Sequence, residues 1–546
     1  MDESANWSRP SHRRGTDSGR WSLWAVTGLT IVGAALRFAT INTRGLWLDE
    51  TTTISQTTRS IWGTILSQVG GTHPPLFHFL MHFWIQWFGT SEVAVRSFAA
   101  VFGIASIPVA YWVGRRLYDR RVGLIAALIL TFSPFGIWYS QEARMYSMLM
   151  FFALLSVGCL SLALEENTRW RWAAYFAVTF LGAFTQYFFL LLLAGQVLYF
   201  VGFELLGREI ELRRTGERQA SRRNPLGVFT DIPTLVPWLV VNSLLAVAVL
   251  AWMNRAVFMS SGSPMVEALT SSGLGYGAPP PSLAIRFDDI GTTLVELLTG
   301  THAPWLTYGL VAMWPVLIYV TLLLLGYGQA RTRTTDLLMC SLAGIPFIWV
   351  LGQWQGVVLL SRYLIPMAAP GLILLAVVLS RIPRRVGKWI LVLCVVLYLG
   401  LYLNQSFDTE AMLRYQNREA FTYVARRYKP GDVVVYEPFY INKLVDYYLP
   451  KTDIAYGLPM FGGTGARDTP AMLVQDLDRV VGTSGRVWVV RSFQNVPDIE
   501  AQSEVTDRWF RDNGYKRAVN IELNKIEVLR FDADGSRRAD LLPRVD

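Results

Sequence analysis

Charged residues are scarce in this chain of 546 residues, where Asp, Glu, Lys and Arg together make up 17% of the sequence. Ordinary soluble domains carry about 25%. The shortage, combined with apolar runs throughout the chain, excludes a string of soluble domains. It predicts a polytopic α-helical membrane protein.

Cysteine and processing signals are also in short supply. The three cysteines, Cys159, Cys340 and Cys394, all lie in apolar stretches, which argues against a disulfide framework or a zinc–thiolate cluster. The polar segment Met1–Arg20 runs straight into a long apolar stretch without a small-residue cleavage site, so we expect no cleavable signal peptide. No internal repeat and no glycine-rich phosphate loop is visible.

The apolar runs predict about eleven membrane spans, since about 20 apolar residues are needed to cross a bilayer. Residues 76–88 are apolar but number only 13. We therefore predict a short helix there that lies in the membrane interface. The predicted spans are 21–41, 92–113, 122–139, 145–164, 171–186, 187–206, 232–254, 304–326, 336–352, 362–380 and 388–404.

Basic residues indicate the orientation of these spans. With the N-terminal tail 1–20 in the cytoplasm, the inner segments hold 22 Lys and Arg, and the membrane region and outer loops hold only eight. Lys and Arg accumulate in cytoplasmic loops, which supports this orientation. The net charge of +9 then reflects topology rather than a nucleic-acid partner. Arg37, near the outer end of the first span, is predicted to snorkel toward the head groups.

The same topology divides the chain into a membrane domain, 21–404, and an extracytoplasmic tail, 405–546. The membrane domain has two long outer loops, 42–91 and 255–303. Helix-like and strand-like stretches alternate in the tail, which predicts a small α/β domain. The predicted helices are 418–428, 441–449, 471–481 and 499–513, and the predicted strands are 432–436, 486–491, 516–522 and 525–531.

Three groups of polar residues should meet at the outer face. Ionisable groups at membrane depth are costly and commonly functional, and a carboxylate beside arginines suits a lipid that carries a phosphate. The groups are Leu46-Trp47-Leu48-Asp49-Glu50 with Thr72-His73-Pro74-Pro75-Leu76, then Ser140-Gln141-Glu142-Ala143-Arg144-Met145-Tyr146, and Ser361-Arg362-Tyr363-Leu364.

In this order, these motifs resemble the GT-C fold clan of polyprenyl-phosphate-sugar-dependent glycosyltransferases. The similar branch is family 39-like and contains the protein O-mannosyltransferases and the lipid A aminoarabinose transferases. The resemblance implies an inverting transfer of a hexose or pentose from a polyprenyl monophosphate carrier to an extracytoplasmic glycan, lipid or protein. It also implies that 21–404 is the catalytic domain and that the enzyme is integral to the cytoplasmic membrane, in contact with its lipids. The high Arg:Lys ratio suggests a bacterial membrane.

The expected chemistry assigns roles to the motif residues. An acceptor hydroxyl loses a proton as it attacks the anomeric carbon, and a positioned carboxylate can take that proton. We assign this role to Asp49, with Glu50 orienting the acceptor or pairing with an arginine. Arg144 and Arg362 are expected to neutralise the lipid phosphate. The other candidates for contacts with the donor are His73, Glu142, Tyr146 and Tyr363.

Two histidines leave a metal ion open. His78 and His82 lie four residues apart in the short helix, a spacing that zinc can use. The alternative is that both rings lie at head-group level in an interfacial helix. No cofactor is required by the sequence, although a divalent metal fits this pair.

Two other functions remain alternatives. A flippase or transporter of polyprenyl lipids or glycolipids would place its polar sites near mid-membrane, on repeated and broken helices. A non-catalytic scaffold for envelope assembly would not need Asp49. Polar groups at one interface and an outer domain of about 140 residues favour the transferase.

Overall fold

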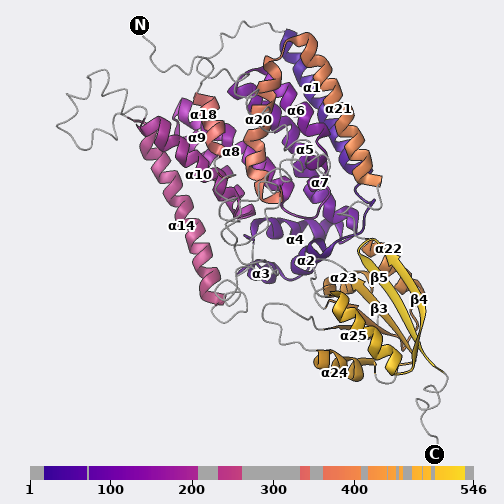
Figure 1. Ribbon diagram of the computed structural model, residues 1–546. Helices are drawn as coiled ribbons and strands as arrows, with labels where there is room; N and C mark the ends of the chain where they lie inside the picture. The colour runs from indigo at the N-terminus through magenta and orange to yellow at the C-terminus, as the bar shows by residue number, and fades with distance from the viewer. Residues whose placement is uncertain are drawn as a thin grey trace, which may run out of the picture. The chain divides into compact units, whose positions relative to one another are not determined.

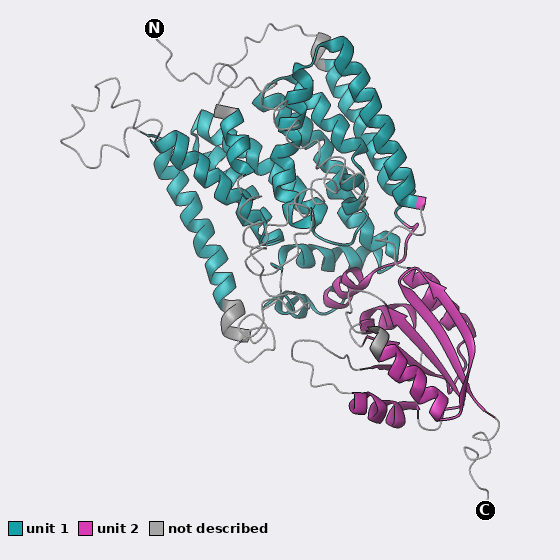
Figure 2. Ribbon diagram, in the orientation of Figure 1, with its two compact units in different colours: residues 1–41, 57–266, 281–406 teal, residues 42–56, 267–280, 407–546 magenta. Residues whose placement is uncertain are grey.

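The computed structural model describes residues 17–69, 73–206, 232–260, 333–342, 344, 361–407, 416–438, 441–450, 454–458, 470–481, 484–492 and 499–534. The chain divides into two compact units (Figure 2). The first comprises 1–41, 57–266 and 281–406, and is helical. The second comprises 42–56, 267–280 and 407–546, and joins a short N-terminal segment to an α/β domain.

Six helices of the first unit are long and apolar enough to cross a membrane, among the residues that the structure describes. A helix satisfies every backbone polar group internally, which is why apolar runs of this length fold as helices in lipid. The finding confirms the polytopic α-helical class. The six helices are α1 (Asp17–Ala39), α5 (Glu92–Leu117), α8 (Tyr146–Glu166), α14 (Leu235–Ser260), α20 (Ile365–Arg381) and α21 (Arg384–Phe407), where α20 reaches the length of a span together with the preceding turn from Arg362.

The predicted count of eleven spans is not confirmed among the described residues. Span 304–326 and most of 336–352 lie outside the described residues. Spans 171–186 and 187–206 correspond to shorter helices, α9 (Arg169–Thr185) and α10 (Phe189–Tyr199), the latter continuing as η1 (Phe200–Leu205). The short helix at 76–88 is confirmed as α4 (Leu76–Phe88). Further short helices of the first unit are α3 (Ile61–Leu66), α18 (Arg333–Ser341) and η2 (Ser361–Leu364).

The predicted span 122–139 is broken into α6 (Arg120–Phe132) and α7 (Pro134–Ser140), which are bent by 60°. Pro134 has no N–H to offer the carbonyl of Leu130, and a new helix starts at this proline with Ser133 as its N-cap. Arg37 of α1 supplies the missing donors: its guanidinium donates to Leu130 O at 3.2 Å and to Thr131 O at 3.4 Å. Arg37 is completely buried, so the prediction that it snorkels is wrong.

Helices α1 and α21 come from opposite ends of the membrane region and lie side by side (Figure 1). The hydroxyl of Tyr402 on α21 donates to Leu36 O at 3.0 Å and lies 3.0 Å from the hydroxyl of Thr40. These contacts tie the last described helix of the first unit to its first helix.

The second unit is built on a five-stranded sheet with the order β2-β1-β3-β5-β4. Strand β1 (Val433–Glu437) is parallel to β2 (Ile454–Gly457) and to β3 (Arg486–Ser492). Strand β5 (Ile526–Ala533) is antiparallel to β3 and to β4 (Tyr515–Leu523). Four of these strands match predicted ones, and β2 was missed.

Helices cover both faces of the sheet. Helices α22 (Asn417–Arg427) and α23 (Asn442–Tyr448) pack on the face that includes Val434 and Trp488. Helices α24 (Pro470–Val481) and α25 (Ile499–Asp512) pack on the opposite face. Strands buried on both faces are continuously apolar rather than alternating, as in the central run of β1.

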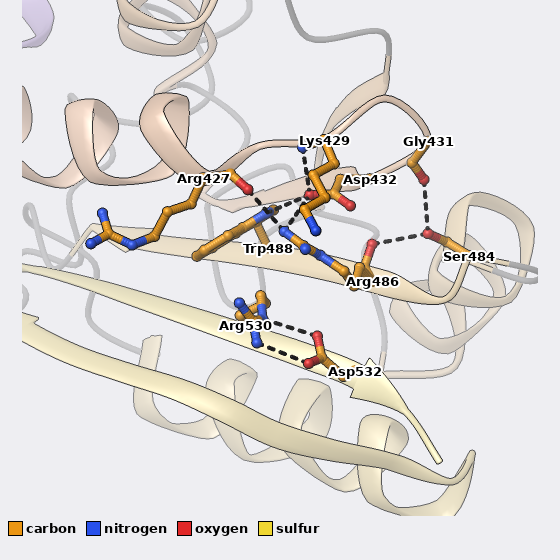
Figure 3. A network of polar contacts seen from close by, with 9 residues as sticks. All are labelled: Arg427, Lys429, Gly431, Asp432, Ser484, Arg486, Trp488, Arg530 and Asp532. Carbon is orange, nitrogen blue, oxygen red and sulfur yellow. Dashed lines mark hydrogen bonds and ion pairs between the residues drawn. The ribbon is translucent and has the colours of Figure 1, made fainter. Parts of the chain in front are cut away.

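Two polar networks hold opposite ends of the central strands. At the start of β1, the Asp432 carboxylate accepts hydrogen bonds from Trp488 Nε1 at 3.0 Å and Arg486 Nη2 at 2.9 Å (Figure 3). At the end of β3, buried Arg491 forms ion pairs with the three carboxylates of Glu437, Asp507 and Glu527. Burial alone would lower the pKa of Arg491, but the carboxylates outweigh burial and raise it.

Candidate active site

The turn between α7 and α8 places Arg144. Its backbone N–H donates to Glu142 O at 2.7 Å, which closes a tight turn after the bent helix pair. Trp138 Nε1 donates to the Glu142 carboxylate at 2.9 Å, so this acid is held against α7. Glu142 and Arg144 are both buried. The predicted motif 140–146 is therefore a compact turn with an arginine built into it.

The structure brings the side chains of Arg144 and His73 into contact. Arg144 Nη2 donates to His73 Nε2 at 2.8 Å. A guanidinium has only donors, so Nε2 must be the unprotonated nitrogen and the ring proton lies on Nδ1. Burial lowers the pKa of His73 well below its usual range, and the charges of Arg144 and Arg362 lower it further. His73 is thus a neutral ring among cations.

His78 joins the same group from the first turn of α4. Its side chain is buried, and burial together with the charge of Arg144 lowers its pKa to about 3. Among the described residues, neither of its ring nitrogens has a hydrogen-bond partner, and neither does Nδ1 of His73. We call His73, His78, Arg144 and Arg362 the Arg144 cluster. It combines two lasting positive charges with two neutral imidazoles, a composition that suits an anion.

Aromatic contacts hold Arg362 and the two tyrosines of the predicted motifs, Tyr146 and Tyr363. Arg362 lies in η2, with its guanidinium carbon 5.8 Å from the ring centroid of Tyr363. Tyr363 in turn stacks on Phe188 at 4.4 Å. Tyr146, at the start of α8, meets Tyr139 edge-on at 4.9 Å. Donor-binding roles for the two predicted tyrosine hydroxyls stay predictions.

Asp49 and Glu50 lie in the first turn of α2 (Leu48–Thr57), and both belong to the second unit. Glu50 is fully buried, and its Oε2 accepts the backbone N–H of Trp47 at 3.3 Å. A glutamate that reaches back in this way completes half of a capping box and helps to start the helix. Asp49 is half-buried. Glu50 is therefore built into the helix start, and Asp49 is the more exposed of the two acids.

The two histidines of the predicted metal pair, His78 and His82, have different surroundings in the described part of the chain. His82 Nδ1 donates to Thr57 O at 2.8 Å, and its Nε2 accepts from Gln86 Nε2 at 2.8 Å. Both nitrogens of His82 are thus engaged, while His78 lies near Arg144. No group of three or more His, Cys, Asp or Glu placed for a metal ion occurs among the described residues. His82 instead borders a cavity of about 600 Å³ between the end of α2 and α4.

A known family model matches the segment that carries most of the Arg144 cluster. Residues 72–214 match the family model described as dolichyl-phosphate-mannose-protein mannosyltransferase. The matched segment contains His73, His78 and Arg144. No curated protein sequence matches the chain.

Two solved structures share the fold. ArnT from Cupriavidus metallidurans, bound to undecaprenyl phosphate, is 15% identical with a TM-score of 0.55, and the match covers 94% of this chain and 98% of that one. The oligosaccharyltransferase AglB from Archaeoglobus fulgidus, in complex with an inhibitory peptide and a dolichol-phosphate, is 13% identical with a TM-score of 0.51. That match covers 94% of this chain and 74% of AglB. Both have the GT-C fold. The chain therefore has the GT-C fold that its motifs predicted and is an integral membrane protein.

Proposed function

We propose that this GT-C fold membrane protein is an inverting glycosyltransferase that uses a sugar linked to a polyprenyl monophosphate. The observation that carries the proposal is the Arg144 cluster. It is an anion site built from side chains that the sequence motifs single out. A transferase of this kind needs such a site for the phosphate of its donor.

The cluster suits the phosphate as a leaving group. The donor is a phosphate diester with one negative charge, and the released polyprenyl phosphate is a monoester with up to two. Two fixed guanidiniums interact more strongly with the second species, so they stabilise charge as it develops. The Nδ1 hydrogen of neutral His73 can donate to a phosphate oxygen without adding a charge.

Asp49 is proposed as the general base. In the reaction, the acceptor hydroxyl oxygen forms a bond to the anomeric carbon from the face opposite the phosphate. The bond between that carbon and the phosphate oxygen breaks, and its electron pair leaves with the phosphate. The hydroxyl proton passes to the Asp49 carboxylate. Glu50 supports this step indirectly by holding the start of α2.

The relatives support the class of donor. ArnT was solved with undecaprenyl phosphate and AglB with a dolichol-phosphate, both of which are polyprenyl phosphates. The matched family model is named for a dolichyl-phosphate-linked mannose. We propose a hexose or pentose as the sugar, and a glycan, lipid or protein on the extracytoplasmic side as the acceptor.

The test uses purified full-length protein in lipid nanodiscs. Polyprenyl phosphates carrying radiolabelled mannose, glucose or aminoarabinose are supplied with a membrane extract, and label is followed into the acceptor fraction. We expect transfer by the wild type and a loss of about 10²–10⁴-fold in Asp49→Asn. Arg169→Gln serves as a control, because Arg169 is exposed on α9.

The outcomes separate the proposed function from its rivals. Equal transfer by wild type and Asp49→Asn would reject Asp49 as the base. Absence of transfer from every lipid-linked sugar, together with directional lipid movement in liposomes, would favour a flippase instead. Absence of both activities would favour a scaffold.

A further inference from the structure

The segment between α1 and α2 is bound by helices from the far end of the chain. The backbone N–H of Leu46 donates to the hydroxyl of Tyr448 at 2.7 Å, and the Asn417 amide donates to Leu46 O at 2.9 Å. Both backbone groups of Leu46 are therefore satisfied by α22 and α23. Leu46 and Asn417 are fully buried.

Arg418 of α22 binds the residues just before Leu46. Its Nη1 donates to Asn42 O at 3.0 Å, and its Nη2 donates to Asn42 Oδ1 at 3.1 Å and to Arg44 O at 2.6 Å. Five hydrogen bonds in all thus join Asn417, Arg418 and Tyr448 to residues 42–46. We call these three residues the clamp.

Gly45 shows how closely the two chain segments approach each other. A Cβ atom added at Gly45 would lie 2.8 Å from Arg418 N and 2.9 Å from Arg418 Cβ. The first of these neighbours is backbone, which cannot rotate away. Only glycine therefore fits at this position without moving the segment away from α22.

The clamp packs against the core of the α/β domain and binds a segment next to the acidic pair. The ring of Tyr448 is nearly parallel to that of Phe421, with the centroids 5.8 Å apart, inside the core of the α/β domain. On the other side, Glu50 accepts the N–H of Trp47, the residue that follows Leu46. The chain from Asn42 to Glu50 is thus held from the clamp to the first turn of α2, which carries Asp49.

We propose that the C-terminal α/β domain positions the catalytic carboxylate, through the clamp residues Asn417, Arg418 and Tyr448. The inference rests on the proposed function, because it takes Asp49 as the base. The clamp residues are positioning residues, since they bind the segment that carries Asp49. The α/β domain is accordingly part of the catalytic machinery and more than an attachment for acceptors.

Hydrogen exchange of the full-length protein tests the clamp without relying on turnover. Tyr448→Phe keeps the ring stack and removes one hydrogen bond, so amides of residues 42–56 should exchange about fivefold faster. Amides of α5 and α8 should be unaffected. The matched control is Tyr423→Phe, which removes a hydroxyl from the same aromatic cluster without touching the segment. Unchanged exchange in Tyr448→Phe would overturn the proposed clamp.

Kinetics of Gly45→Ala test the link to catalysis. Displacing the acidic segment should lower kcat, by about 10²-fold for a shift of 1 Å, with little change in the KM for the lipid donor. Gly485→Ala in the same unit is the control, since a Cβ there meets nothing within 4 Å. A wild-type kcat in Gly45→Ala would overturn the positioning role. A wild type that transfers no sugar would instead overturn the proposed function, and the exchange result would still stand.

Discussion

Arg144 donates to Nε2 of His73 over 2.8 Å, and this contact sets the tautomer of an imidazole that burial keeps neutral. A histidine that accepts from a guanidinium cannot carry a proton on the same nitrogen. The positive charge of the cluster therefore comes from Arg144 and Arg362 alone. Since guanidiniums stay protonated at any physiological pH, that charge is permanent.

The first prediction concerns the affinity for polyprenyl phosphate. Arg144→Gln removes a charged donor to the phosphate, and a hydrogen bond to a charged group is worth about 1.5–3 kcal/mol. The dissociation constant of undecaprenyl phosphate, titrated into nanodiscs and followed by native mass spectrometry, should rise about 10–100-fold. The dissociation constant of Arg144→Lys should lie between those of the wild type and Arg144→Gln, because lysine keeps the charge but lacks the two-pronged donor geometry of a guanidinium. An unchanged constant in Arg144→Gln would remove this residue from the donor site.

The second prediction concerns stability in acid. His78 titrates near 6.5 when unfolded, and its pKa in the folded chain is about 3. Between these values only the unfolded chain takes up the proton, so stability falls as the pH decreases below about 6.5, by at most about 1.4 kcal/mol per unit. Melting temperatures at pH 6.5, 5.5 and 4.5 should fall less steeply in His78→Leu than in wild type. Parallel curves would show that His78 does not contribute.

The third prediction concerns the broken helix. Arg37→Met removes the donors that serve Leu130 O and Thr131 O in a buried place, which should cost about 3 kcal/mol of unfolding free energy. Adding Pro134→Ala returns an N–H to the carbonyl of Leu130 and should recover part of the loss. Thermal unfolding in detergent measures both changes. Purely additive effects of the two substitutions would argue against a shared role at the break.

The fourth prediction concerns the ion network of the α/β domain. Arg491→Met leaves the completely buried Glu437 without its cation, and breaking a buried pair costs about 3–5 kcal/mol. The deficit should shrink from pH 8 to pH 5, because a buried carboxylate without a neighbouring cation takes up a proton more readily. Proteolysis of the folded tail at both pH values reports the difference. Arg479→Gln is the control, since its ion pair with Asp476 is largely exposed.

Much of the fold could be predicted because single segments determine it. A long apolar run such as that of α8 must become a helix in lipid, whatever surrounds it. The bend between α6 and α7 was not predicted, although Pro134 is plain in the sequence. Whether a helix stops at a proline depends on which group donates a hydrogen bond to the carbonyl that the proline leaves without one. Here the donor is Arg37, 93 positions away from Leu130. The short strand β2 was missed because four residues carry too little pattern.

The candidate site could be predicted only in part, because the contacts between distant segments are not visible in the sequence. Charge counting placed His73 and Arg144 on one side of the membrane, but it could not tell that they touch. The spacing of His78 and His82 indicated a shared helix face, whereas the partner of each ring depends on other segments. Thr57 at the end of α2 engages His82, and Arg144 lies near His78. The clamp was invisible for the same reason, since Leu46 and Asn417 are 371 positions apart.

The two edge strands of the sheet, β2 and β4, affect how readily the α/β domains of different molecules could associate. Strand β2 has only four residues, and β4 exposes Lys516 and Arg517 and is interrupted by an irregularity between Arg517 and Val519. Short, charged and irregular edges cannot easily pair with the sheet of another molecule. The α/β domain is thus protected against edge-to-edge polymerisation, even where many copies crowd one membrane surface.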